Sequence, residues 1–293
     1  MTDLKIAGAP ITWGVCEVPG WGAQLPVERV LREMMELGLT ATEFGPEGFL
    51  PEEPADRAAA LRASGLEAVG GFVPVVLHDP ERDPLPALRT ELEAFVAAGA
   101  GVVVLSADSG LSGYDERVEL DETGWSTLLT TLGRARDAAA EVGVLAVLHP
   151  HVGTLVESRA DVERVLDGTD VGLCLDSGHL LIGGTDPVEL ARDHAARIRH
   201  VHLKDVHLPT AQRVRDGEIT YYEAVQQGLY RPLGQGDVDV RSLLQSLLGA
   251  GYDGWFVLEQ DTVLQVLPAD GEGPVADAGA SAAHLRSLAA ELA

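Results

Sequence analysis

Short apolar runs rich in Val, Ile and Leu alternate in this chain with longer segments of helical period, and this alternation limits the folds open to it. It is typical of βαβ units, whose strands form a parallel sheet. The eight predicted strands lie near residues 4–9, 40–44, 67–72, 101–105, 143–148, 171–175, 198–203 and 255–258. Eight strands with intervening helices in 293 residues fit one closed (β/α)8 barrel. We therefore predict an α/β fold with a single domain over residues 1–293.

The main alternative to a barrel is an open, doubly wound sheet. Its first strand would lead into a G-x-G-x-x-G turn, and residues 9–14, which read A-P-I-T-W-G, do not match that pattern. The chain also lacks the Gly-Lys-Ser/Thr loop that cradles nucleotide phosphates. The closed barrel is the better interpretation.

Helix boundaries are visible in the sequence at two places. A proline at Pro26 opens a segment of helical period that a glycine, Gly38, closes. Ser158 offers an N-cap with Asp161 three positions later, a variant of the capping box with Asp in place of Glu. Both signals predict helices between strands.

Two segments interrupt the alternation. Residues 205–239 are long and polar and contain Tyr221, Tyr222 and Tyr230, so we expect a functional βα loop. These tyrosines suit a lid over the site or a contact between the subunits of a homo-oligomer, and the sequence leaves both open. Residues 267–279 are rich in Gly, Ala, Pro and acid and predict a flexible excursion before the last helix.

Charge and composition narrow the class of partner. Lys and Arg total 21 against 46 Asp and Glu, a formal charge of −25. Recognition of nucleic acid needs clustered basic residues, so we expect no nucleic-acid partner. Two cysteines are too few for a disulfide framework, and no secretory signal or membrane span is recognisable. We expect a cytoplasmic protein that acts on a small molecule and has no membrane partner.

Polar residues gather where the predicted strands end, which is where barrels carry their chemistry. They are Glu43 after the second strand, His149 and His151 after the fifth, Asp176 and His179 after the sixth, His202 and Lys204 on the seventh, and Glu259 after the eighth. Such a set of nitrogen and oxygen ligands suits one divalent ion, namely Mn²⁺, Co²⁺, Zn²⁺ or Mg²⁺.

Each of these residues also has an ordinary structural interpretation. An acidic residue after a strand is often a helix N-cap, and His200 and His202, which share a strand face, could be buried histidines with backbone partners. Trp13, Trp21 and Phe49 could pack in the core or line a pocket. The convergence of ligand types from four consecutive strand ends favours a shared metal site.

At these residues the chain resembles the xylose isomerase-like TIM barrel superfamily of sugar isomerases and epimerases, and within it the inosose (2-keto-myo-inositol) dehydratase family. The resemblance spans nearly the whole chain. Its motifs are APITWG at residues 9–14, TEFG at 42–45, HPHVGT at 149–154, LDSGH at 175–179, HVHLKD at 200–205, PLGQG at 232–236 and WFVLEQD at 255–261.

The resemblance implies one metal ion held by Glu, Asp, His and a second Glu from strands five to eight, with Mn or Co favoured. Asp176, His202 and Glu259 match the last three positions. The strand-five position holds His149, and the nearest carboxylate is Glu157, eight residues later. The register of the strand favours His149 as the metal ligand, whereas the usual carboxylate chemistry of this position favours Glu157. We expect Glu157 to be the ligand.

The reaction implied is dehydration of a keto-polyol such as 2-keto-myo-inositol through an enediolate. His151 and Glu43 are the candidate base and acid, and Lys204 could stabilise enolate charge. The residues expected to contact substrate are Trp13, His149 and His179.

Other reactions begin in the same way. Ketose epimerisation, aldose–ketose isomerisation and the opening of 3-keto-C-glycosides share the first proton abstraction, so sequence leaves them open. A non-catalytic sugar-binding barrel is disfavoured by the retained ligand set, and a metal-dependent hydrolase by the lack of a second metal cluster. The activity of relatives that cut DNA at abasic sites is also disfavoured. Those proteins need more metal ligands than this chain offers and a surface suited to phosphate, which the charge of −25 opposes.

Overall fold

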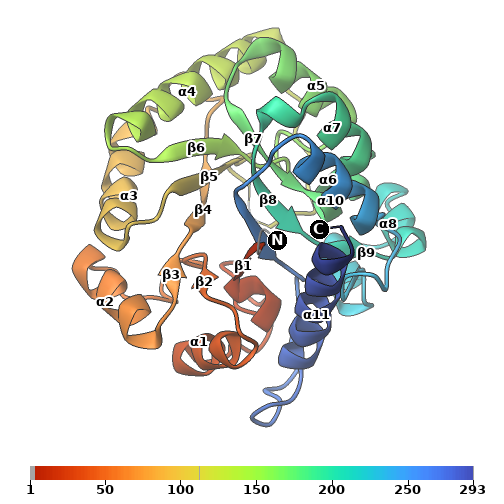
Figure 1. Ribbon diagram of the computed structural model, residues 1–293. Helices are drawn as coiled ribbons and strands as arrows, with labels where there is room; N and C mark the ends of the chain where they lie inside the picture. The colour runs from red at the N-terminus through yellow and green to blue at the C-terminus, as the bar shows by residue number, and fades with distance from the viewer. Residues whose placement is uncertain (1–3, 112, 293) are drawn as a thin grey trace.

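The structure is a computed structural model that describes residues 4–111 and 113–292. Its centre is a nine-stranded parallel barrel (Figure 1) in the order β3-β2-β1-β11-β8-β7-β6-β5-β4. The barrel strands are β1 (Lys5–Gly8), β2 (Ala41–Thr42), β3 (Glu67–Ala68), β4 (Gly70–Val75), β5 (Val102–Ala107), β6 (Leu145–Leu148), β7 (Gly172–Asp176), β8 (Ile198–Leu203) and β11 (Trp255–Leu258).

The barrel closes at Val69, the single residue between β3 and β4. Its N–H donates to the Thr42 carbonyl oxygen at 3.0 Å, and its carbonyl accepts from the Gly101 N–H at 3.1 Å. β3 and β4 thus act as one barrel strand, the one predicted at residues 67–72. The predicted eight-stranded barrel pattern and α/β fold class are confirmed.

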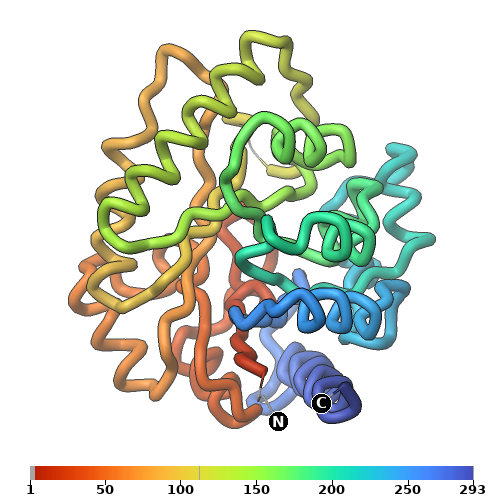
Figure 2. Tube along the Cα trace, turned by 45° about the horizontal axis from the view of Figure 1, so that its top comes forward, coloured from red at the N-terminus to blue at the C-terminus, as the bar shows by residue number. Residues whose placement is uncertain are grey.

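Helices surround the barrel on its outer side, and the last helix packs against the turn after the first strand and against the last strand (Figures 1 and 2). The helices are α1 (Val27–Glu36), α2 (Pro54–Ser64), α3 (Leu85–Ala98), α4 (Glu122–Glu141), α5 (Arg159–Gly168), α6 (Ser177–Ile182), α7 (Pro187–Asp193), α8 (Leu208–Arg215), α9 (Tyr221–Gln226), α10 (Val240–Gly249) and α11 (Pro274–Leu292), with 3-10 turns η1 (Pro10–Trp13) and η2 (Ala195–Arg197). No helix in the described part of the chain is long and apolar enough to cross a membrane.

The local helix signals act as expected. Pro26 caps α1, and Gly38 beyond its end has a φ of 71°, which favours glycine. The Ser158 side chain accepts from the Asp161 N–H, and Asp161 in turn accepts from the Ser158 N–H, which completes the capping box of α5. Residues close in sequence to each helix end are enough to determine these boundaries.

The segment expected to be a flexible excursion, residues 267–279, is partly helical. α11 begins at Pro274, so only the residues before it form a loop. Proline suits the first turn of a helix because its missing N–H would have no partner there. The Gly- and Pro-rich composition therefore predicted a loop that extends several residues beyond the true start of the helix.

The expected loop at residues 205–239 has secondary structure of its own. β9 (Asp205–Val206) pairs antiparallel with β10 (Tyr230–Arg231), and α8 and α9 lie between them. The Asp205 carboxylate accepts four backbone N–H groups, at 2.8 to 3.0 Å, from Val206, Gly234, Gly236 and Val238. This buried carboxylate holds the segment against the end of β8.

The interior of the barrel is filled by small apolar side chains. They form two groups, one of Ala7, Ala9, Ala41, Val69 and Val257 and the other of Val104, Val147 and Cys174. A larger core lies between the strands and the helices. The small apolar side chains fill the middle of the barrel. A pocket can therefore form only at the carboxyl ends of the strands, where the side chains are polar.

Candidate active site

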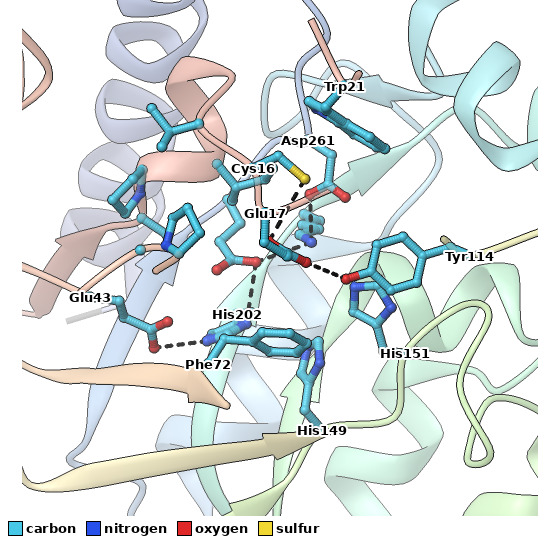
Figure 3. Close-up of a pocket in the computed structure, with 18 residues that line it drawn as sticks. Cys16, Glu17, Trp21, Glu43, Phe72, Tyr114, His149, His151, His202 and Asp261 are labelled. Carbon is cyan, nitrogen blue, oxygen red and sulfur yellow. Dashed lines mark hydrogen bonds and ion pairs between the residues drawn. The ribbon is translucent and has the colours of Figure 1, made fainter. Parts of the chain in front are cut away.

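A cavity of about 80 Å³ lies at the carboxyl ends of the strands. Its lining includes Glu43, His149, His151, His202, Lys204 and Glu259 from the predicted set. Figure 3 shows Glu43 and His151 on opposite sides of it, with His202 between them. The structure thus brings together residues from β2, β6, β8 and β11 that lie far apart in the chain.

Asp176, His202 and Glu259 present ligand atoms that lie within 4.8 Å of one another. His202 Nδ1 is 3.3 Å from Glu259 Oε2 and 3.7 Å from Asp176 Oδ2. The other oxygen of Asp176 accepts the N–H groups of Gly178 and His179 at 2.9 Å, which aims Oδ2 at the cluster. The predicted trio therefore converges on one point.

The unpaired nitrogen of His202 provides a test of whether a metal ion fits. His202 Nδ1 is buried and makes no hydrogen bond, although two carboxylates face it. On the other side of the ring, Nε2–H donates to Glu43 Oε1 at 3.0 Å. Burial opposes a charged ring, but neighbouring groups, Glu259 and Glu43 among them, outweigh it and raise the pKa of His202, so the position at Nδ1 favours positive charge. With a metal ion at Nδ1 in place of a proton, the ring is neutral and the carboxylate behind Nε2–H orients it. These residues fit a divalent ion.

Glu43 holds two histidines with one oxygen. Besides His202, its Oε1 accepts from His200 Nε2–H at 2.8 Å. Burial opposes ionisation, but His202 and His200 outweigh it and hold the pKa of Glu43 well below its usual range. Glu43 is therefore an ionised acceptor, and this differs from the expectation that it supplies a proton. His200, which sequence left as a buried histidine, is part of this support.

Lys204 lies between the carboxylates of the site. Its Nζ is 2.7 Å from Asp261 Oδ1 and 3.0 Å from Glu259 Oε2, and it donates to His179 Nε2 at 2.8 Å. Burial disfavours the charge, but Asp176, Asp261 and Glu259 outweigh it, so the pKa of Lys204 is raised well above its ordinary value. An ammonium group is thus held beside the metal-binding trio.

His151 has the environment of a proton acceptor. Its Nδ1–H donates to the Val152 carbonyl at 2.7 Å, which leaves Nε2 with a lone pair. Burial, with the nearby His149 and Lys204, lowers its pKa well below the ordinary value. Its ring lies on that of His179, with centroids 3.7 Å apart. The ring is therefore neutral and held in place.

His149 and Glu157 lie in different environments. His149 Nε2 is 3.3 Å from Asp176 Oδ2, and its ring centroid is 5.0 Å from that of His202. Glu157 instead accepts the Gly153 N–H at 2.9 Å and lines a separate cavity. The structure does not bring the Glu157 side chain to the metal-binding trio, because the turn after β6 folds it back on Gly153.

Trp13 and His179, both expected to contact substrate, lie outside the cavity lining. Trp13 is 1% exposed and its Nε1–H donates to Glu33 on α1, so it packs behind the site. His179 accepts a hydrogen bond from Lys204 Nζ, and its ring packs on that of His151. The short turn η1 directs Trp13 outward, and sequence spacing does not reveal that direction.

Several lining residues were not singled out from the sequence. Tyr114 and Glu17 meet at the mouth, where the Tyr114 hydroxyl donates to the Glu17 carboxylate (Figure 3). Asp261 accepts from the Tyr221 hydroxyl at 2.6 Å, which draws the 205–239 segment to the site. Asp261 follows a ligand position by two residues, a signal that could have identified it. Glu17 and Tyr114 lie on loops and show no such signal.

Comparison with known proteins agrees with this geometry. The xylose isomerase-like TIM barrel family matches residues 31–288. The rhizopine catabolism protein MocC of Rhizobium meliloti is 35% identical over 271 residues, which cover 89% of this chain and 82% of the relative. An inosose dehydratase of Geobacillus kaustophilus is 33% identical over 274 residues, which cover 89% and 88%.

Solved structures share the fold at low sequence identity. The IOLI protein with a bound zinc atom superposes with a TM-score of 0.72 at 15% identity, over 99% of each chain. An L-ribulose 3-epimerase superposes with a TM-score of 0.71 at 15% identity, over 99% of this chain and 96% of the other. This chain belongs to the xylose isomerase-like TIM barrel family.

Proposed function

We propose that this protein is a metal-dependent lyase that dehydrates a keto-polyol such as 2-keto-myo-inositol. The observation that carries the proposal is the convergence of Asp176, His202 and Glu259 around a histidine nitrogen that has no hydrogen bond. Relatives named inosose dehydratase, 28% to 33% identical over most of the chain, support this reaction over others of the superfamily.

His149 is the fourth ligand in this proposal, in place of the expected Glu157. It holds the strand-five position beside Asp176, and Glu157 lies on another cavity. Two imidazoles and two carboxylates suit Mn²⁺ or Co²⁺, the ions we favour. When bound, the ion would act as a Lewis acid toward the carbonyl and neighbouring hydroxyl oxygens of the substrate.

The protein side chains would then move one proton. His151 Nε2 takes the proton from the carbon next to the carbonyl, because this nitrogen is neutral and faces the cavity. The Lys204 ammonium stabilises the negative charge that this leaves on the substrate. His151 then returns the proton to the departing β-hydroxyl, which leaves as water. Glu43 stays ionised throughout and orients His202.

Epimerisation is a second candidate, and the position of Glu43 favours it. An epimerase needs acid–base groups on both faces of one carbon, and Glu43 and His151 line the cavity from opposite sides (Figure 3). Glu43 Oε1 already accepts hydrogen bonds from His200 and His202, and relatives are named inosose dehydratase, which is why we place dehydration first.

One experiment separates the two reactions. The metal-loaded protein is incubated with 2-keto-myo-inositol in deuterated water, and ultraviolet absorbance and deuterium content are followed. Dehydration gives a conjugated carbonyl that absorbs, whereas epimerisation exchanges the α-proton without new absorbance. A chelator should stop either reaction. Turnover with neither new absorbance nor deuterium in the product would rule out both and indicate a hydride shift or hydrolysis.

A further inference from the structure

A second cavity, of about 380 Å³, opens beside the catalytic one. It lies between the loop after β2, strand β4 and helices α2 and α3, the elements on the left side of Figure 1. Its apolar lining includes Phe44, Leu50, Phe72, Val73 and Phe95. The proposed dehydration of a bare ring uses none of this space.

The two cavities adjoin. Glu17, Gly45, Pro46 and Phe72 line both of them. The Phe72 ring lies 5.9 Å from that of His149 and 5.7 Å from that of His151, between centroids, so it separates the metal-binding residues from the second cavity. A group attached to a ring held at the catalytic centre can therefore extend past Phe72 into this space.

The second cavity combines aromatic rings with one cation. Phe44 packs edge-on against Phe95 with centroids 4.9 Å apart, and the Arg57 guanidinium lies over the Phe44 ring at 5.3 Å. The Arg57 side chain is only 13% exposed, yet within the described part of the chain it donates one hydrogen bond, from Nε to the Pro51 carbonyl. Its nearest carboxylate, on Glu91, is 4.0 Å away. N–H groups therefore remain to bind an oxygen atom.

The surrounding charges limit what can enter. Glu17, Glu47 and Glu91 are exposed and line the cavity, so they repel an anionic group such as phosphate. Aromatic walls favour a flat apolar group, and the spare guanidinium donors favour an oxygen on it.

We propose that this second cavity is a subsite for an uncharged aromatic group, bearing an oxygen, that is joined through an ether or glycosidic oxygen to the polyol ring. This inference rests on the proposed function for the location of the ring. It places the natural substrate among aryl-substituted keto-polyols, of which 2-keto-myo-inositol is only the bare core.

The test measures binding, which does not depend on turnover. Methyl, phenyl and 4-hydroxyphenyl β-D-glucopyranosides are titrated calorimetrically into Mn²⁺-loaded protein. We expect the phenyl glucoside to bind at least about tenfold more tightly than the methyl glucoside, and the 4-hydroxyphenyl glucoside to bind more tightly than the phenyl glucoside. Equal affinities for the methyl and phenyl ligands, or no measurable binding of the phenyl ligand, would overturn the subsite.

Two variants locate the effect. Val73→Trp fills the cavity and should reduce the phenyl-to-methyl affinity ratio to near one. Arg57→Met keeps a stem over Phe44 but removes the donors, so it should abolish only the gain from the 4-hydroxyl. Arg89→Met, which removes an exposed arginine paired with Glu141, is the control and should change neither ratio. A Val73→Trp protein that keeps the full ratio would place the phenyl group elsewhere.

The outcome is separable from that of the dehydratase assay. If the glycoside series shows the expected ratios but 2-keto-myo-inositol is not converted, the subsite stands and the proposed reaction fails. If 2-keto-myo-inositol is dehydrated and the ratios are flat, the reaction stands and the subsite fails.

Discussion

Glu43 is the residue whose role the structure changes most. Its carboxylate faces the cavity, yet one oxygen accepts hydrogen bonds from both His200 and His202. A carboxylate behind a metal-binding histidine sets which ring nitrogen carries the proton and raises the basicity of the other. At the scale of single residues, the site depends on this support as much as on the ligands.

Glu43→Gln should therefore weaken metal binding. The amide keeps the size of the side chain but loses its charge and can no longer hold two imidazole N–H groups equally well. We expect a loss of about 10- to 100-fold in affinity for Mn²⁺, measured by titration. Glu47→Gln, an exposed neighbour, is the matched control. Full Mn²⁺ affinity with lost turnover would instead assign Glu43 an acid–base role.

A second residue-scale prediction concerns the strand-five ligand. His149→Gln should lower Mn²⁺ affinity at least about tenfold, because it removes a nitrogen beside Asp176. Glu157→Gln should leave the affinity nearly unchanged, because its amide still accepts the Gly153 N–H away from the trio. The opposite pattern of affinities would make Glu157 the ligand.

At the scale of elements, the segment from β9 to β10 is attached to the site through Asp205. This residue follows Lys204 directly, and its carboxylate accepts the N–H groups of Gly234 and Gly236. A Cβ at Gly236 would lie 2.3 Å from Asp205 Oδ1, so only glycine fits there. The glycine-rich turn is thus needed for close approach of its backbone to a buried carboxylate.

Gly236→Ala should destabilise this element. Overpacking of this kind costs about 1–3 kcal/mol, which lowers the denaturant midpoint, and turnover should fall with it because Lys204 shifts. Gly133→Ala in α4 is the control: nothing lies within 4 Å of its added Cβ, and alanine is the better helix former. An unchanged midpoint for Gly236→Ala would mean that the Asp205 carboxylate moves aside freely.

At the scale of the whole molecule, the barrel concentrates like charges in one buried place. The carboxylates of Asp176, Glu259 and Asp261 lie around one ammonium group, that of Lys204, and the carboxylate of Glu43 faces His200 and His202 nearby. Burying negative charges without compensation is costly. The folded barrel is therefore built to gain stability from a divalent cation.

Removal of metal should lower the melting temperature. At a Mn²⁺ concentration about 100 times the Kd, binding stabilises the fold by about 2.7 kcal/mol, which corresponds to several degrees in Tm. Calorimetric melts with Mn²⁺ and with chelator measure the difference. Asp176→Asn should lose most of this dependence, whereas Glu157→Gln should keep it. Equal melting temperatures with metal and with chelator would contradict a site for the ion in the folded protein.

Sequence by itself determined the fold and identified three residues that converge in the site. Apolar runs of strand length and helices marked by Pro26, Gly38 and Ser158 are local signals, because backbone propensity and capping depend on near neighbours. Asp176, His202 and Glu259 were identifiable because parallel strands of a barrel bring their carboxyl ends to one face.

Tertiary structure decided which way the remaining side chains point. Glu157 folds back on Gly153 and Trp13 turns to Glu33, although both follow strands as ligand and substrate residues would. Glu43 meets His200 across a sequence separation of 157, and no local pattern encodes that contact. The physical reason is that a residue's position after a strand determines at which end of the barrel it lies. The direction of its side chain depends on the turn that carries it and on packing against distant elements.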